Sequence, residues 1–171
     1  MCGITGFVCA KHELEEAKKT LKAMADLIAH RGPDGEGFYV DGQAALGHRR
    51  LSIIDLEGGS QPMFNEDKNL VTVFNGEIYN FMELREQLAA AGHVFATHSD
   101  TEVLLHGYEE WGEALPEKLR GMFAFVIWDK ANRTLFGARD IFGIKPFYYY
   151  QNEDLLLFGS EIKSFLPHPG F

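Results

Sequence analysis

The chain has 171 residues, of which 46% are hydrophobic and 24% charged, a composition typical of a folded globular domain. The formal net charge of −9 at pH 7 argues against nucleic acid or an anionic membrane as the main partner. No apolar run approaches the roughly 18 residues of a membrane-spanning helix. The two cysteines argue against a disulfide-stapled secreted protein. We therefore expect one cytoplasmic domain that acts on a small substrate.

The chain begins with Met1-Cys2-Gly3. Removal of Met1 would leave Cys2 with both a thiol and a free α-amine, a group whose ordinary pKa of about 7.7 to 8.0 lets it accept the thiol proton. This pairing suits acyl transfer. The alternative is a small, buried cysteine without a chemical role. The apolar segment from Ile4 to Val8 predicts a strand that would hold Cys2 on rigid structure.

Three segments show the 3.6-residue apolar periodicity of amphipathic helices. They run over residues 13–30, 80–92 and 99–112. Asn80 and Ser99 each precede a glutamate by three residues, the pattern of a capping box at a helix start. The second and third segments end at Gly92 and Gly112, a residue type common at helix ends.

Short apolar segments between turn residues predict strands. They cover residues 4–8, 38–40, 44–48, 51–54, 70–74, 122–128, 135–139, 146–150 and 155–159. Asn75-Gly76 is a typical hairpin turn and is expected to close the strand 70–74. Several of these strands are apolar on both sides, so layers must cover both faces. We expect an α+β fold of two stacked antiparallel sheets with helices outside.

The sequence carries no metal or cofactor signature. The two cysteines and seven histidines include no C-x-x-C or H-x-x-x-H pair. The glycine-rich stretch 31–37 lacks the Gly-Lys-Ser/Thr ending of a phosphate loop and contains two acidic residues that would repel phosphate. We expect the domain to use neither a metal nor a cofactor.

Eight blocks, in one order, resemble the glutaminase domain of asparagine synthetase. They are Met1-Cys2-Gly3-Ile4, Arg31-Gly32-Pro33-Asp34, and residues 47–53, 74–80, 99–102, 121–125, 139–146 and 158–163. The resemblance covers essentially the whole chain, 1–171, as one class II glutamine amidotransferase (glutaminase) domain. It implies the four-layer α-β-β-α sandwich of N-terminal nucleophile hydrolases and glutamine as the substrate.

The resemblance also implies a mechanism. Cys2 would attack the side-chain amide of glutamine and form a glutamyl thioester, while its α-amine carries the proton. Asn75 and Gly76 would form the oxyanion hole with a side-chain amide and a backbone N–H, and one such donor typically contributes about 2.7 to 4 kcal/mol. Arg31 and Asp34 are expected to order the loop near the nucleophile.

The remaining implied site residues bind the amino-acid end of glutamine. Arg50 would grip the α-carboxylate, since a guanidinium offers two parallel donors. Asp100 would pair with the ammonium, with groups near Ile53 and Glu77 completing the pocket. Arg49 has the same chemistry as Arg50, but strand alternation places it on the opposite face. The alternatives are a solvated arginine and an aspartate that only compensates a helix dipole.

Asparagine synthetases carry a second domain that binds ATP through a Ser-Gly-Gly-x-Asp-Ser type loop, and these 171 residues contain no such loop. ATP and magnesium are therefore expected only in that synthetase domain, which would receive the ammonia. The chain is expected to be an excised domain, with a stand-alone subunit as the alternative. Other open readings are a non-catalytic scaffold that docks a synthetase domain, an N-terminal nucleophile hydrolase of another amide, and a different acceptor. The sequence is compatible with an oligomer.

Overall fold

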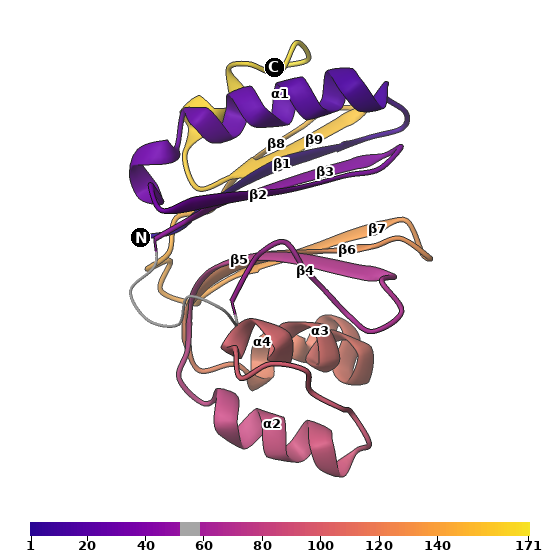
Figure 1. Cartoon of the computed structure of the whole chain (residues 1–171), viewed down its shortest axis with the longest axis vertical. Coiled ribbons are helices and arrows are strands. Elements are labelled where there is room, and N and C mark those ends of the chain that lie inside the picture. Colours follow the sequence, from indigo (N-terminus) through magenta and orange to yellow (C-terminus); the bar gives the residue numbers. More distant parts are fainter. Residues whose placement is uncertain (52–58) are drawn as a thin grey trace.

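The computed structural model describes residues 1–51 and 59–171. Two antiparallel sheets are stacked face to face, with helices on both outer surfaces (Figure 1). The first sheet has the order β2-β3-β1-β9-β8 and consists of β1 (Gly3–Cys9), β2 (Gly35–Val40), β3 (Ala44–Arg50), β8 (Tyr148–Gln151) and β9 (Leu155–Gly159). The second has the order β4-β5-β6-β7 and consists of β4 (Met63–Phe64), β5 (Leu70–Ile78), β6 (Gly121–Asp129) and β7 (Thr134–Arg139).

Helices form the two outer layers (Figure 1). The first sheet is covered by α1 (Leu14–Asp26) and the 3-10 turn η3 (Ile162–Phe165). The second is covered by α3 (Asp100–Trp111), with α2 (Phe81–Ala90) and α4 (Leu115–Lys118) packed against it. The short 3-10 turns are η1 (Ala29–Arg31) and η2 (Gly112–Ala114). The predicted α-β-β-α sandwich is confirmed. None of the described helices is long and apolar enough to cross a membrane.

The space between the sheets is filled by apolar side chains from both. These include Ile4, Leu46, Val71, Val73, Val126, Trp128 and Phe158. Because side chains alternate across a strand, every second residue of β1, β3 and β5 points into this layer. A polar residue that lies two positions before or after one of these apolar residues on the same strand therefore also faces the opposite sheet. The candidate site is built from such polar residues.

The first helix is shorter than its periodicity predicts. It ends at Asp26, because the N–H of Ile28 bonds to the carbonyl of Ala25 at 3.1 Å in place of a helical i−4 partner. The chain then forms η1 before Gly32. Leu14, expected on the core face, is 46% exposed at the start of the helix.

The strand that contains Asn75 is longer than predicted. Residues 70–78 form one strand paired along its whole length with β6, so Asn75 and Gly76 lie inside a sheet and not in a turn. At the following helix the Asn80 side chain does not cap; it bonds instead to the backbone of Lys118 and Arg120. Ser99 does cap α3, accepting the N–H of Thr101 at 3.2 Å.

Candidate active site

Cys2 lies immediately before β1 and is half-buried. The backbone N–H of Leu51, the residue after β3, lies 3.4 Å from Cys2 Sγ. Arg31 Nε donates to the Cys2 carbonyl at 3.1 Å, and Arg31 itself is paired with Glu161 at 3.1 Å. The thiol and the backbone of Cys2 are thus both held by neighbouring segments, and Arg31 orders the region around Cys2 as the sequence predicts.

Arg49 and Arg50 take opposite sides of β3. Arg49 pairs with Glu36 at 2.6 Å and with Asp26 of α1, so its guanidinium lies on the helix side of the sheet. The positive charge of Arg50 helps to lower the pKa of His48, a buried residue that is hydrogen-bonded to the backbone of Phe74 in β5 of the opposite sheet. The alternation of the strand therefore directs Arg50 toward the layer between the sheets, where a substrate carboxylate is expected.

Asn75 is buried within β5, with 2% of its surface exposed, on the same strand face as Val71 and Val73. Its Nδ2 group has no hydrogen-bond partner among the described residues. Such a group carries a desolvation cost of about 1 to 3 kcal/mol unless something accepts its proton. The Asn75 amide is thus a buried donor available to a ligand.

Gly76 is required by the neighbouring strand. A Cβ atom at this position would lie 2.2 Å from the carbonyl oxygen of Met122 and 2.7 Å from the Cα of Phe123, both in β6. The obstruction comes from the protein backbone, so the pairing of β5 with β6 explains why a glycine stands at this position.

Two carboxylates lie at the end of β5. Glu77 is exposed and shares the strand face of Asn75, by alternation. Asp100 is the first residue of α3, and its Oδ2 accepts the N–H of Ile78 at 3.0 Å. Burial raises the pKa of Asp100, the bond from Ile78 lowers it, and the charge of Glu77 raises it again, with a net upward shift. A cationic group placed here would relieve that repulsion.

His48 is the site residue that sequence reasoning missed. It is 2% exposed and hydrogen-bonded to the backbone of Phe74, and it links β3 to β5 next to Asn75. Burial lowers the pKa of His48 to about 4, so the ring is neutral at pH 7. The available signal was a polar residue at an inward position of β3, two residues after buried Leu46.

These contacts bring most of the predicted residues to one end of the sandwich. The start of β1, the end of β3 and the end of β5 lie at the same end of the two sheets (Figure 1). His48 joins the side that carries Cys2 and Arg50 to the side that carries Asn75. Ile53, the remaining predicted residue, lies outside the described residues.

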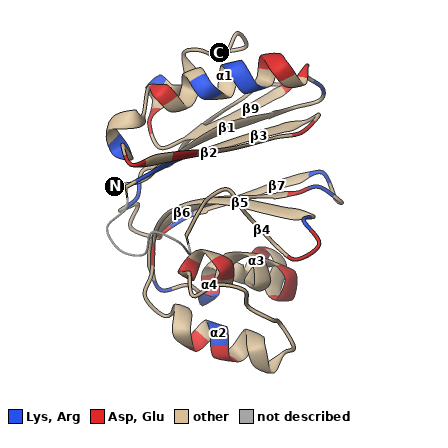
Figure 2. Ribbon diagram, viewed as in Figure 1, with Lys and Arg blue, Asp and Glu red and all other residues tan. Residues whose placement is uncertain are grey.

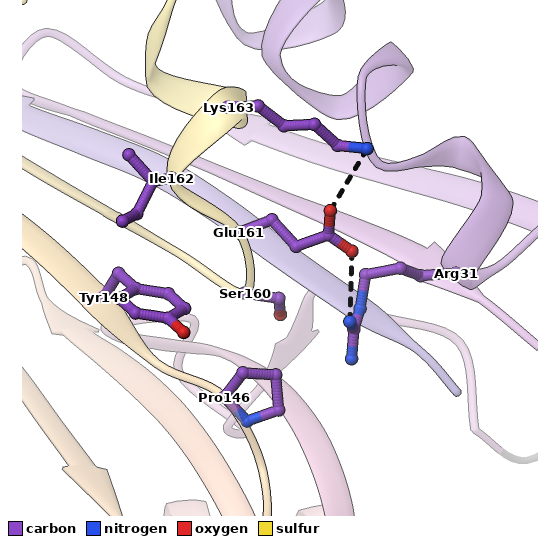
Figure 3. A pocket seen from close by; sticks show the side chains of 7 residues that line it. All are labelled: Arg31, Pro146, Tyr148, Ser160, Glu161, Ile162 and Lys163. Carbon is purple, nitrogen blue, oxygen red and sulfur yellow. Dashed lines mark hydrogen bonds and ion pairs between the residues drawn. The ribbon is translucent and has the colours of Figure 1, made fainter.

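A pocket of about 450 Å³ lies beside this region (Figure 3). Glu161 accepts from both Arg31 and Lys163 in its wall, each at 3.1 Å. Its lining is Arg31, Pro146, Tyr148, Ser160, Glu161, Ile162 and Lys163. Except for Arg31, which orders the Cys2 backbone, none of these belongs to the predicted site. Arg31 therefore connects this pocket to the backbone of Cys2, while the other lining residues lie outside the predicted site.

The four layers are those of an N-terminal nucleophile hydrolase fold, and two solved structures share it. The glutamine phosphoribosylpyrophosphate amidotransferase from B. subtilis, complexed with ADP and GMP, is 25% identical with a TM-score of 0.73, over 96% of this chain and 43% of that one. A structure described as the allosteric regulatory enzyme of purine biosynthesis is 26% identical with a TM-score of 0.78, over 97% and 43%.

Sequence comparison defines the family. Residues 1–171 match the family model described as a glutamine amidotransferase domain, and the chain belongs to that family. Asparagine synthetase [glutamine-hydrolyzing] 1 of Bacillus subtilis (strain 168) is 51% identical over 97% of this chain and 27% of its own length. Asparagine synthetase [glutamine-hydrolyzing] 3 of the same organism is 47% identical over 99% and 28%. The chain thus spans about a quarter of the length of the curated relatives it matches.

Proposed function

We propose that the chain hydrolyses the side-chain amide of glutamine to glutamate and ammonia, with Cys2 as the nucleophile. The observation that carries the proposal is the buried Nδ2 of Asn75, which has no partner among the described residues, at the end of the sandwich where Cys2 precedes β1. An uncompensated buried donor is what an oxyanion hole requires before substrate binds.

The reaction proceeds in two stages. The α-amine of Cys2 takes the thiol proton, and the sulfur forms a bond to the amide carbon, whose oxygen becomes negative. Asn75 Nδ2 and the Gly76 N–H stabilise that oxygen, and the amide nitrogen leaves as ammonia with the proton from the amine. Water then cleaves the glutamyl thioester and releases glutamate. The α-amine is free only after removal of Met1, because a peptide nitrogen cannot serve as the base.

The amino-acid end of glutamine binds to charged groups at the same end of the sandwich. Arg50 holds the α-carboxylate, and Asp100 holds the ammonium with Glu77 beside it. The raised pKa of Asp100 and its proximity to Glu77 support this role, since two neighbouring carboxylates favour a cation.

The ammonia passes to an ATP-dependent synthetase domain that forms asparagine, and that domain binds ATP and magnesium. Support comes from the asparagine synthetases among the relatives, of which this chain covers 27% and 28%. The loop between β7 and β8 supplies a surface for such a domain: Ile141 is 92% exposed, Phe142 86% and Ile144 56%. A patch of neighbouring apolar side chains that are exposed to water is typical of an interaction surface.

Rapid-quench mass spectrometry with glutamine tests the proposal. We expect a glutamyl adduct on the peptide that contains Cys2, which disappears in Cys2→Ala and persists in Cys9→Ser. Cys9 is the matched control because it is the other cysteine of the chain, at the far end of β1, the strand that follows Cys2. An adduct on another residue would refute the thioester at Cys2. The absence of any adduct in protein that begins at Cys2 and turns over glutamine would refute it as well.

A further inference from the structure

A cluster of histidine and glutamate side chains lies on the helical layer that covers the second sheet. His93 follows α2, while His106 and Glu109 lie on α3. The Nδ1 atoms of the two histidines are 3.2 Å apart, and Glu109 Oε2 lies 3.3 Å from His106 Nδ1 and 3.4 Å from His93 Nδ1. Three potential ligand atoms therefore form a nearly equilateral triangle.

The size of this triangle matches a metal coordination sphere. Zinc binds imidazole nitrogen at about 2.0 to 2.1 Å and carboxylate oxygen at about 2.0 to 2.2 Å, in a tetrahedron. Two ligands at such distances are about 3.3 to 3.5 Å apart at the tetrahedral angle. The three observed separations of 3.2, 3.3 and 3.4 Å fit one face of that tetrahedron.

The contacts of the groups that do not face the centre of the triangle also fit a metal site. Histidines that bind a metal usually direct the other ring nitrogen to a carboxylate. His93 Nε2 lies 3.2 Å from Glu110, and His106 Nε2 lies 3.6 Å from Glu102. The second oxygen of Glu109 accepts from Asn65 Nδ2 at 2.7 Å, which leaves Oε2 directed at the histidines.

Protons and a cation satisfy this arrangement differently. One proton, on either Nδ1 atom, leaves the other ring nitrogen with a lone pair that faces the Glu109 carboxylate. Two protons let both Nδ1–H groups donate to the single oxygen Glu109 Oε2, with the two donor nitrogens 3.2 Å apart. A cation at the centre satisfies all three contacts at once, and it balances the acidic side chains of α3 and its surroundings (Figure 2).

We propose that His93, His106 and Glu109 bind a zinc ion. Glu66 completes the site directly or through water; it lies 3.8 Å from His106 Nδ1, and its side chain is 58% exposed. Two imidazoles and a carboxylate suit zinc better than magnesium or calcium, which prefer all-oxygen ligands. His106, on α3, is buried, and His93, in the connection between α2 and α3, is half-buried. An ion bound to both side chains fastens this connection to α3. The role is structural and independent of glutamine hydrolysis.

Isothermal titration of metal-free, tag-free protein with zinc chloride tests the site. The parent is a Cys2→Ala/Cys9→Ser variant, because thiols bind zinc and Cys9 lies 3.2 Å from His12. We expect one equivalent of zinc, a raised Tm, and no response to magnesium. His93→Asn and Glu109→Gln lower the affinity at least 100-fold, and Glu110→Gln lowers it about 10- to 100-fold.

His98→Ala is the matched control, because His98 is an exposed histidine in the same α2–α3 connection outside the cluster. It keeps full zinc affinity. Cobalt(II) provides a second readout, since a tetrahedral nitrogen and oxygen site gives a d–d spectrum that His93→Asn abolishes. The His93→Asn and Glu109→Gln proteins are compared only after their metal-free Tm matches that of the parent. Zinc binding that these variants leave unchanged, or an absence of binding by the parent, overturns the proposal.

Discussion

Asp100 Oδ2 accepts the backbone N–H of Ile78 at 3.0 Å, so the first residue of α3 is fastened to the last residue of β5. This bond fixes a carboxylate three residues from Asn75 along the strand. It explains how a helix in the outer layer contributes to a site between the sheets.

The first prediction concerns Asp100→Asn, which keeps the oxygen that accepts from Ile78 and removes only the charge. A hydrogen bond to a charged group contributes about 1.5 to 3 kcal/mol. We expect kcat/KM for glutamine to fall about 10- to 150-fold, mainly through KM. An unchanged KM, measured by steady-state glutamate release, would exclude Asp100 from the ammonium site.

A pH titration sharpens this test. The pKa of Asp100 is raised by burial, so the carboxylate gains its proton, and loses its charge, at a higher pH than an ordinary aspartate. Glutamine binding to Cys2→Ala, measured by calorimetry, is therefore expected to weaken as the pH falls through that raised pKa. Cys2→Ala/Asp100→Asn should bind weakly at every pH and lack this dependence.

The second prediction separates catalysis from stability at Asn75. Asn75→Ala removes the oxyanion donor, so we expect kcat to fall about 100- to 1,000-fold with little change in KM. Its Nδ2 has no partner among the described residues, so the free energy of unfolding should change by no more than about 1 kcal/mol.

Asn65→Ala is the contrasting variant. Asn65 bonds to Glu109 at 2.7 Å and to the N–H of Leu70 at 3.0 Å, on the helix side of the sheet. We expect it to lower the free energy of unfolding by about 1 to 3 kcal/mol and leave kcat unchanged. Urea denaturation and steady-state kinetics on both proteins provide the comparison. A large stability loss in Asn75→Ala with normal kcat would make that residue structural.

The third prediction uses the adjacent arginines. Arg50→Lys loses the two-pronged geometry for the substrate carboxylate, so KM should rise about tenfold or more while stability is retained. Arg49→Lys should leave KM unchanged and lower the free energy of unfolding by up to about 1 kcal/mol, because its partners Glu36 and Asp26 are partly exposed. The reverse pattern in kinetics and urea unfolding would contradict the assignment.

The fourth prediction concerns His48 and acid stability. The folded protein holds the pKa of His48 near 4, through burial and the neighbouring Arg50, whereas the unfolded chain binds that proton near 6.5. Between these values the unfolded state carries more protons, so stability rises with pH and is lost as the pH falls from 6.5 to 4. The loss from this group is at most about 3 kcal/mol.

Urea unfolding at pH 7 and pH 4.5 measures that loss. His48→Gln should be less stable at pH 7 but show a smaller loss on acidification. The exposed His98→Ala should lose as much stability as the parent. Equal acid sensitivity in His48→Gln and the parent would mean that other groups control the response.

The sequence predicted the architecture because the apolar patterns of helices and strands survive in the fold. The strands expected over residues 122–128 and 135–139 formed as β6 and β7, and Ser99 caps α3. The other half of the expected capping box did not form, because Glu102 accepts from the N–H groups of Ala96 and Thr97 and not from that of Ser99. Asn75-Gly76 did not form the turn that its local propensity favours, since pairing with β6 continues the strand through Ile78. Tertiary packing overrode a local signal at this point, inside the candidate site.

Contacts between distant segments could not be predicted from local pattern. The bond from His48 to Phe74 depends on how two sheets stack, and the cluster of His93, His106 and Glu109 depends on how α3 packs near the end of α2. The absence of a paired histidine motif led to the expectation of no metal. A metal site assembled from separate segments leaves no such motif.

Glutamate release from glutamine by the purified chain, with its N-terminus established by intact mass, tests the central claim most directly. Protein that begins at Cys2 should release glutamate and ammonia in equal amounts, and so should Cys9→Ser. Cys2→Ala, and protein that retains Met1, should release neither above the buffer rate. Equal turnover by Cys2→Ala, or full activity with Met1 attached, would contradict the role of Cys2 as nucleophile and of its α-amine as base.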